Sequence, residues 1–148
     1  MDIWNWVEKL QGDLRQAGQA QNAHLLNRLA DEVSELRVDR VDALLPEARA
    51  LGKALDNPWV DVYVGHWALR NRVGNRVEGE SALGEAVALF ERAHREDTLE
   101  CPQSICVTQD LAACYGNIDG PGWVPERIEV CDETLGRIDP SWACFQCL

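Results

Sequence analysis

Apolar residues recur at intervals of three and four along most of this chain, a spacing that places them on one face of an α-helix. Between residues 2 and 17 these positions are Ile3, Trp6, Val7, Leu10 and Leu14. Comparable stripes follow at about 25–36, 41–55, 58–76, 83–93, 102–115 and 123–137, and a short segment opens after Pro140. No segment alternates apolar and polar residues for long enough to predict a strand. The pattern predicts an all-α protein of about seven or eight helices.

Prolines punctuate this pattern. "LDNPW" at 55–59 ends one helix and begins the next, because a proline disfavours helix for the residue before it and is tolerated in a first turn. Pro46 lies within the third segment, where it either occupies a first turn or bends a longer helix. The fourth segment is apolar nearly all round, so we expect it to be buried between neighbouring helices.

The proline-marked helix starts also reveal a repeat. They fall at Pro58, Pro102 and after Pro140, at spacings of 44 and 38, and each interval holds two predicted helices. Such periods are typical of an α-solenoid, whose antiparallel helix hairpins bury their apolar faces by stacking on one another. The prediction is one domain over 1–148, divided into an N-terminal helix (1–19), a degenerate repeat (20–56), two repeats (57–98 and 99–139) and the start of a further helix (140–148).

Three stretches resemble the tetratricopeptide repeat family. "GESALGEAVALFERAHRED" at 79–97, with Ala86, Phe90 and Ala93 at spacings of four and three, is similar to the second helix of such a repeat. "LAACY" is similar to its first helix and "LGRIDP" to its usual ending. The resemblance covers about residues 20–148 and departs from the family at Cys131, where a large aromatic residue is usual. It implies stacked hairpins and, as in most of the family, a protein-interaction scaffold; divergent bacterial copies also serve as regulatory or sensor modules of larger proteins.

The charge balance narrows the choice of partner. The chain carries a formal net charge of −11, whereas nucleic-acid binders carry clustered lysine and arginine, so no nucleic acid is expected. Over 101–148 the cations are Arg127 and Arg137, against seven carboxylates, and a partner at this end is expected to be basic or neutral. No apolar run approaches the ~18 residues of a membrane span, and no secretory signal opens the chain. We expect a cytoplasmic protein without membrane contact.

The cysteines are concentrated in the last third of the chain. They are Cys101, Cys106, Cys114, Cys131, Cys144 and Cys147. A cytoplasmic chain is kept reduced, so structural disulfides are not expected. Zinc is one alternative, with Cys101, Cys106, Cys144 and Cys147 as its ligands, and redox reactivity is another. We favour a third, that the thiols pack as small apolar side chains and that no cofactor is bound, because free cysteine is among the most buried residue types.

Alignment of the repeats points to a binding surface. When Ala68 is matched with Ala112, His66 and Asp110 fall at equivalent positions on neighbouring first helices, on the face that lines the groove of a repeat array. Asn117 falls there likewise, and Arg70 belongs to the small basic stretch "RNRVGNR" at 70–76. His66, Arg70, Asp110 and Asn117 are the predicted contacts to a protein or peptide. For His66 and Asp110 we favour a simpler alternative, a charge pair that only joins one helix to the next.

These observations predict a non-catalytic protein-binding module, because no nucleophile or second acid accompanies His66 and Asp110 in a recognisable catalytic motif. The alternative is a regulatory or sensing domain of a larger protein that binds a small ligand or zinc through its C-terminal cysteines. The apolar residues Trp142, Phe145 and Leu148 in the last predicted helix also predict self-association into a homo-oligomer.

Overall fold

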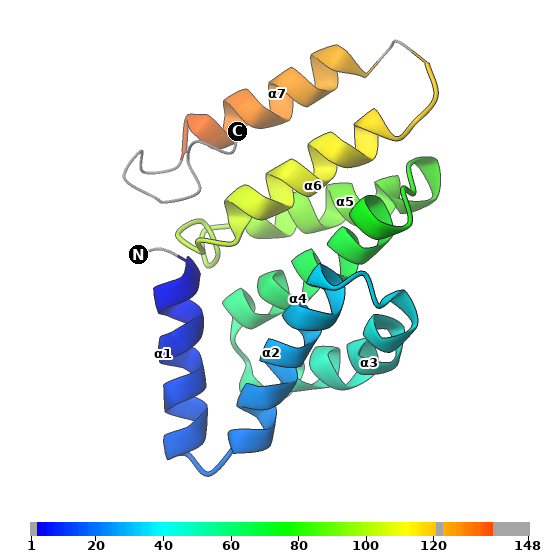
Figure 1. Ribbon diagram of the computed structural model, residues 1–148. Helices are drawn as coiled ribbons and strands as arrows, with labels where there is room; N and C mark the ends of the chain where they lie inside the picture. The colour runs from blue at the N-terminus through cyan, green and yellow to red at the C-terminus, as the bar shows by residue number, and fades with distance from the viewer. Residues whose placement is uncertain (1–2, 121–122, 138–148) are drawn as a thin grey trace.

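The computed structural model describes residues 3–120 and 123–137, and throughout these residues the regular structure is helical (Figure 1). The elements are α1 (Ile3–Gln16), α2 (Ala20–Ser34), α3 (Val38–Leu55), α4 (Pro58–Arg70), the π-helical turn η1 (Asn71–Asn75), α5 (Glu80–Ala93), α6 (Ser104–Gly116) and α7 (Val124–Leu135). The all-α prediction is confirmed. The predicted further helix at 140–148 lies outside the described residues.

Neighbouring helices in the sequence are neighbours in space. Each helix from α1 to α7 packs against the next, and α4 packs in addition against both α2 and α6. Figure 1 shows α7 lying along α6 at one end of the molecule, with α2 and α3 at the other and α4 between them. Over the described ranges, none of the helices combines the length and the apolarity that a bilayer crossing requires.

The apolar core consists of two clusters that meet at α4. The first joins α1, α2, α3 and α4, and the second joins α4, η1, α5 and α6. α4 contributes Val60 and Tyr63 to the first cluster and Val62 and Leu69 to the second, while Trp59 packs against both. The burial expected for this helix is therefore confirmed: its apolar residues point in every direction because it is enclosed on several sides.

Pro46 lies well inside α3, not in its first turn. Of the two alternatives for this proline, the structure adopts the longer helix that contains it. The residue is on the exposed side of α3, where water can satisfy the carbonyl that proline leaves without a donor.

The predicted helix over 58–76 changes its winding at Asn71. Beyond α4 the chain makes a π-helical turn, in which the Arg76 amide donates to the Asn71 carbonyl at 3.2 Å. Two side-chain amides tie this turn to its neighbours. Asn75 Nδ2 donates to the Val33 carbonyl in α2 at 2.9 Å, and Asn117 Nδ2, just past α6, donates to the Val73 carbonyl at 2.9 Å. The π-turn therefore fixes the ends of α2 and α6 relative to α4.

Polar contacts attach α7 to the rest of the protein. Across the whole of α7, all of which is described, Thr134 is the only buried residue. Its Oγ1 lies 2.6 Å from Thr108 Oγ1 on α6 and 3.2 Å from His94 Nε2 at the end of α5. His94 Nδ1 donates to the Phe90 carbonyl at 2.7 Å, and burial lowers the pKa of His94, so Nε2 is an acceptor. The Thr134 hydroxyl, which has one proton, lies within reach of this nitrogen and of the Val130 carbonyl at 3.0 Å.

Thr134→Val tests this attachment. The substitution keeps the side-chain shape and removes the hydroxyl, and with it the contacts to Thr108 and His94. We expect the free energy of unfolding in urea to fall by about 1–2 kcal/mol. Hydrogen exchange should accelerate across α7 more than across α5. The control is Glu129→Gln at an exposed position of the same helix, and equal exchange of the two variants would contradict the proposed attachment.

Candidate functional site

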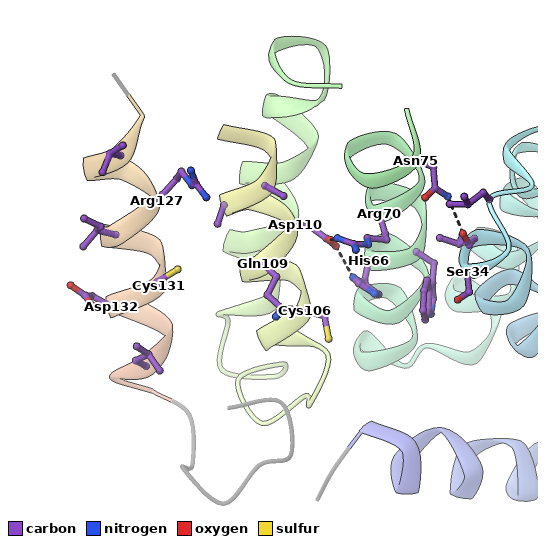
Figure 2. A pocket seen from close by; sticks show the side chains of 18 residues that line it. Ser34, His66, Arg70, Asn75, Cys106, Gln109, Asp110, Arg127, Cys131 and Asp132 are labelled. Carbon is purple, nitrogen blue, oxygen red and sulfur yellow. Dashed lines mark hydrogen bonds and ion pairs between the residues drawn. The ribbon is translucent and has the colours of Figure 1, made fainter. Parts of the chain in front are cut away.

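One face of the molecule contains a groove bounded by the end of α2, by α4, α6 and α7. It encloses about 960 Å³. Figure 2 shows α7, α6 and α4 side by side with the labelled side chains of the groove, and Ser34 and Asn75 on its far side. Helix α6 packs against α7 on one side and against α4 on the other. The groove therefore runs across three helices that are packed in a row.

A buried, hydrogen-bonded pair of titratable side chains forms the floor of this groove. His66 Nδ1 on α4 lies 2.6 Å from Asp110 Oδ2 on α6, and both residues are buried. Since a carboxylate accepts, Nδ1 donates this hydrogen bond. The other carboxylate oxygen of Asp110 lies 3.7 Å from the Arg70 guanidinium, one turn along α4. A carboxylate removed from water needs such partners, because an unpaired buried charge costs several kcal/mol.

The structure brings together three of the four predicted contact residues. His66, Arg70 and Asp110 all line the groove, and His66 and Asp110 meet as the alignment of Ala68 with Ala112 predicts. The same hydrogen bond joins α4 to α6. It therefore also fits the alternative interpretation, in which His66 and Asp110 hold two helices together and do not contact a partner. Arg70 keeps 49% of its side chain exposed and is the member of the group that a ligand can reach.

Asn117 is not part of the groove lining. Its amide nitrogen donates to the Val73 carbonyl and, at 3.2 Å, to the Glu78 carbonyl. The chain approaches so closely here that a Cβ on Gly79 would lie 2.6 Å from the Asn117 carbonyl oxygen. The prediction of Asn117 as a groove contact is corrected: its side chain serves the connection between α6 and the π-turn.

The apolar rim of the groove was missed by the sequence analysis. Val124, Ile128 and Leu135 on α7 are 55%, 56% and 36% exposed, and Leu36 after α2 is 68% exposed. All four line the groove, and among the described residues the remaining large apolar side chain with comparable exposure is Val77. The α7 stripe is visible in the sequence, where its helical spacing is indistinguishable from that of a buried face.

Leu36 has a strained backbone. Its φ is 59°, in the left-handed region. Its amide donates to the Val33 carbonyl at 3.1 Å and the Arg37 amide donates to the Glu32 carbonyl at 2.9 Å, the hydrogen-bond pair of a Schellman helix end, where glycine is usual. A side chain at such a position costs roughly 1–2 kcal/mol. Leu36 therefore combines a strained left-handed backbone with a side chain at the rim of the groove.

The cysteines divide between core and groove. Cys101 and Cys114 are completely buried in the second core cluster, and desolvation raises the pKa of Cys101 to about 12 and also raises that of Cys114. Packing is confirmed for these two thiols. Cys106 and Cys131 are half-buried and line the groove.

The predicted zinc set is not assembled by the described residues. Cys101 belongs to the core and Cys106 to the groove lining, so this pair does not face one site. Over 3–120 and 123–137 no group of three or more histidine, cysteine, aspartate or glutamate residues has a metal-binding arrangement. Cys144 and Cys147, with Trp142, Phe145 and Leu148, lie outside the described residues.

Glycine substitution tests the strain at Leu36. Leu36→Gly should raise the free energy of unfolding by about 0.5–1 kcal/mol, because glycine adopts the left-handed conformation without the Cβ penalty although it adds entropy to the unfolded chain. Val77→Gly is the matched control, since Val77 has a φ of 55° and is exposed outside the groove. Both should gain stability in urea unfolding. A loss in either variant would show that its backbone is not strained.

Thiol labelling tests the division of the cysteines. Under native conditions a maleimide should modify Cys131 while Cys101 and Cys114 stay unmodified until denaturant exposes them, because the latter two are completely buried and Cys131 is half-buried. Burial raises the pKa of all three thiols, so access rather than pKa sets the difference in rate. Peptide mapping by mass spectrometry identifies each modified residue. Labelling of Cys101 at the rate of Cys131 would contradict the assignment.

Comparisons with known proteins supply no relative for this site. No family model, no curated protein and no solved structure matches the chain. The resemblance to tetratricopeptide repeats therefore stays a prediction, and function is argued from the geometry of the groove.

Proposed function

We propose that the chain is a non-catalytic protein-interaction module that binds a segment of a partner protein in the groove between α4, α6 and α7. One observation carries this proposal: four of the five large apolar side chains that remain conspicuously exposed in the described part of the chain border the same groove. Scattered exposed apolar residues are normal on a protein surface, but a contiguous patch marks a site of association.

The architecture we propose is a tetratricopeptide-like array of the hairpins α2–α3, α4–α5 and α6–α7. The packing of α4 against both α2 and α6 supports stacking of the first helices of each hairpin. Two hydrogen bonds support the register: His66 with Asp110, and Asn117 with Val73, each span 44 residues. This offset equals the spacing of the helix starts at Pro58 and Pro102. Such an array presents a continuous surface along its first helices.

The groove contributes to binding in two ways. Its rim supplies apolar area, and removal of such area from water contributes about 25 cal/mol per Å² before the costs of association. Its floor supplies the half-exposed Arg70 guanidinium, which orients polar groups of the ligand. The Asp110 carboxylate, which is itself fixed by its hydrogen bond with His66, holds Arg70 in place. We therefore expect the rim to set affinity and the floor to set the orientation of the bound segment.

Selection from a displayed library of random peptides tests the proposal. Peptides enriched on the wild-type chain are measured by fluorescence anisotropy against Ile128→Asp and against the control Val77→Asp, which alters a comparably exposed apolar residue outside the groove. Ile128→Asp should weaken binding about tenfold or more, because it places a charge in the apolar rim. Val77→Asp should leave binding unchanged. Failure to enrich any peptide that depends on Ile128 would overturn the proposal.

A further inference from the structure

The exposed surface of α7 combines apolar and acidic residues. A second hollow lies beside the groove and is lined by Val124, Pro125, Ile128, Glu129, Asp132 and Glu133. Val124, Ile128 and Asp132 line both hollows, so the groove continues over α7 without interruption. The second hollow contains three carboxylates and no cation.

Two of these carboxylates carry unneutralised charge. Glu133 pairs with Arg137 at 2.5 Å. Glu129 and Asp132 are exposed, and within the described residues neither forms an ion pair. Both line the same hollow as Ile128, so a ligand that covers Ile128 there also meets both charges. A carboxylate covered by a ligand loses water and needs a cationic partner from that ligand.

The lining of the groove also contains two arginines, Arg70 and Arg127. Arg70 approaches the Asp110 carboxylate at 3.7 Å. The Arg127 guanidinium carbon lies 3.6 Å from the position of a Cβ on Gly116, so this side chain lies over the C-terminal end of α6. The carbonyls at a helix C-terminus attract cations. Arg70 is therefore partly neutralised by Asp110, and the hollow over α7 that adjoins the groove is lined by carboxylates as its charged residues.

We infer that the occupant of the groove is a basic amphipathic helix of a partner protein, with one apolar face bordered by lysine or arginine. This inference rests on the proposed function. The exposed apolar residues of α7 extend from Val124 to Leu135, which is about 16 Å at 1.5 Å per residue. A partner helix of about three turns covers this length. Its apolar residues at i, i+3 or i+4, and i+7 would face those of α7. Its cations pair with Glu129 and Asp132, and the net charge of −11 attracts such a segment from a distance.

Two synthetic peptides of about 16 residues test this inference. They share one leucine pattern and carry either lysine or glutamate at the flanking positions. The lysine peptide should bind the wild-type chain and the glutamate peptide should not. The double variant Glu129→Lys/Asp132→Lys should bind the lysine peptide about tenfold more weakly, whereas a control with two matched reversals on another helix, Asp39→Lys/Glu47→Lys on α3, should change binding much less. Affinity should also fall as salt rises from about 50 to about 300 mM.

Several results would overturn the inference and leave the proposed function intact. One is that the chain prefers the glutamate peptide, or selects neutral or acidic peptides from the library, and that Ile128→Asp abolishes this binding. Another is equal binding of the lysine peptide by the two double variants. A dimer in gel filtration that Ile128→Asp dissociates would identify a second copy as the occupant. If the peptide binds only to the variant Trp142→Ser/Phe145→Ser, the occupant of the groove is the segment 138–148 of the same chain. If no peptide depends on Ile128, the proposed function itself fails.

Discussion

The contacts of the Thr134 hydroxyl hold α7 against the rest of the protein, and they leave the apolar side chains of this helix exposed to solvent. A helix usually joins a fold by burying its apolar stripe, but α7 is held at one end by the contacts of Thr134 with Thr108 and His94. At the other end the ring of Trp123 stacks on that of Tyr115, with the centroids 5.2 Å apart. Because these contacts use few apolar side chains, the stripe of α7 stays available and becomes one wall of the groove.

α4 connects this wall to the remainder of the core. It belongs to both apolar clusters and also carries His66 and Arg70, so the groove floor is built on the helix that the two clusters share. The Asp110 carboxylate lies between α4 and α6 and is held by His66 from a helix that has little freedom to move. The floor is therefore preorganised, and a ligand need not order these side chains on binding, which reduces the entropic cost of association.

Sequence reasoning located the helices well because their apolar spacing is regular and their boundaries are marked by prolines and glycines. It also paired His66 with Asp110, since the repeat offset carries spatial information. It did not foresee the π-turn at Asn71, whose stabilising partners, Val33 and Asn117, are distant in sequence. Nor did it identify the rim of the groove. An apolar stripe has the same spacing whether it is covered or open, and only the packing of α7 distinguishes the two.

The alternation of apolar and acidic residues on α7 has a consequence for the unbound chain. An open apolar stripe favours indiscriminate association between copies, which limits the concentration at which a protein remains dispersed. Glu129 and Asp132 border that stripe, and like charges on two approaching copies repel one another. Replacement of these two carboxylates by neutral side chains would remove the repulsion and leave the apolar stripe free to associate. The colloidal stability of the chain thus depends on a few carboxylates that lie beside its exposed apolar stripe.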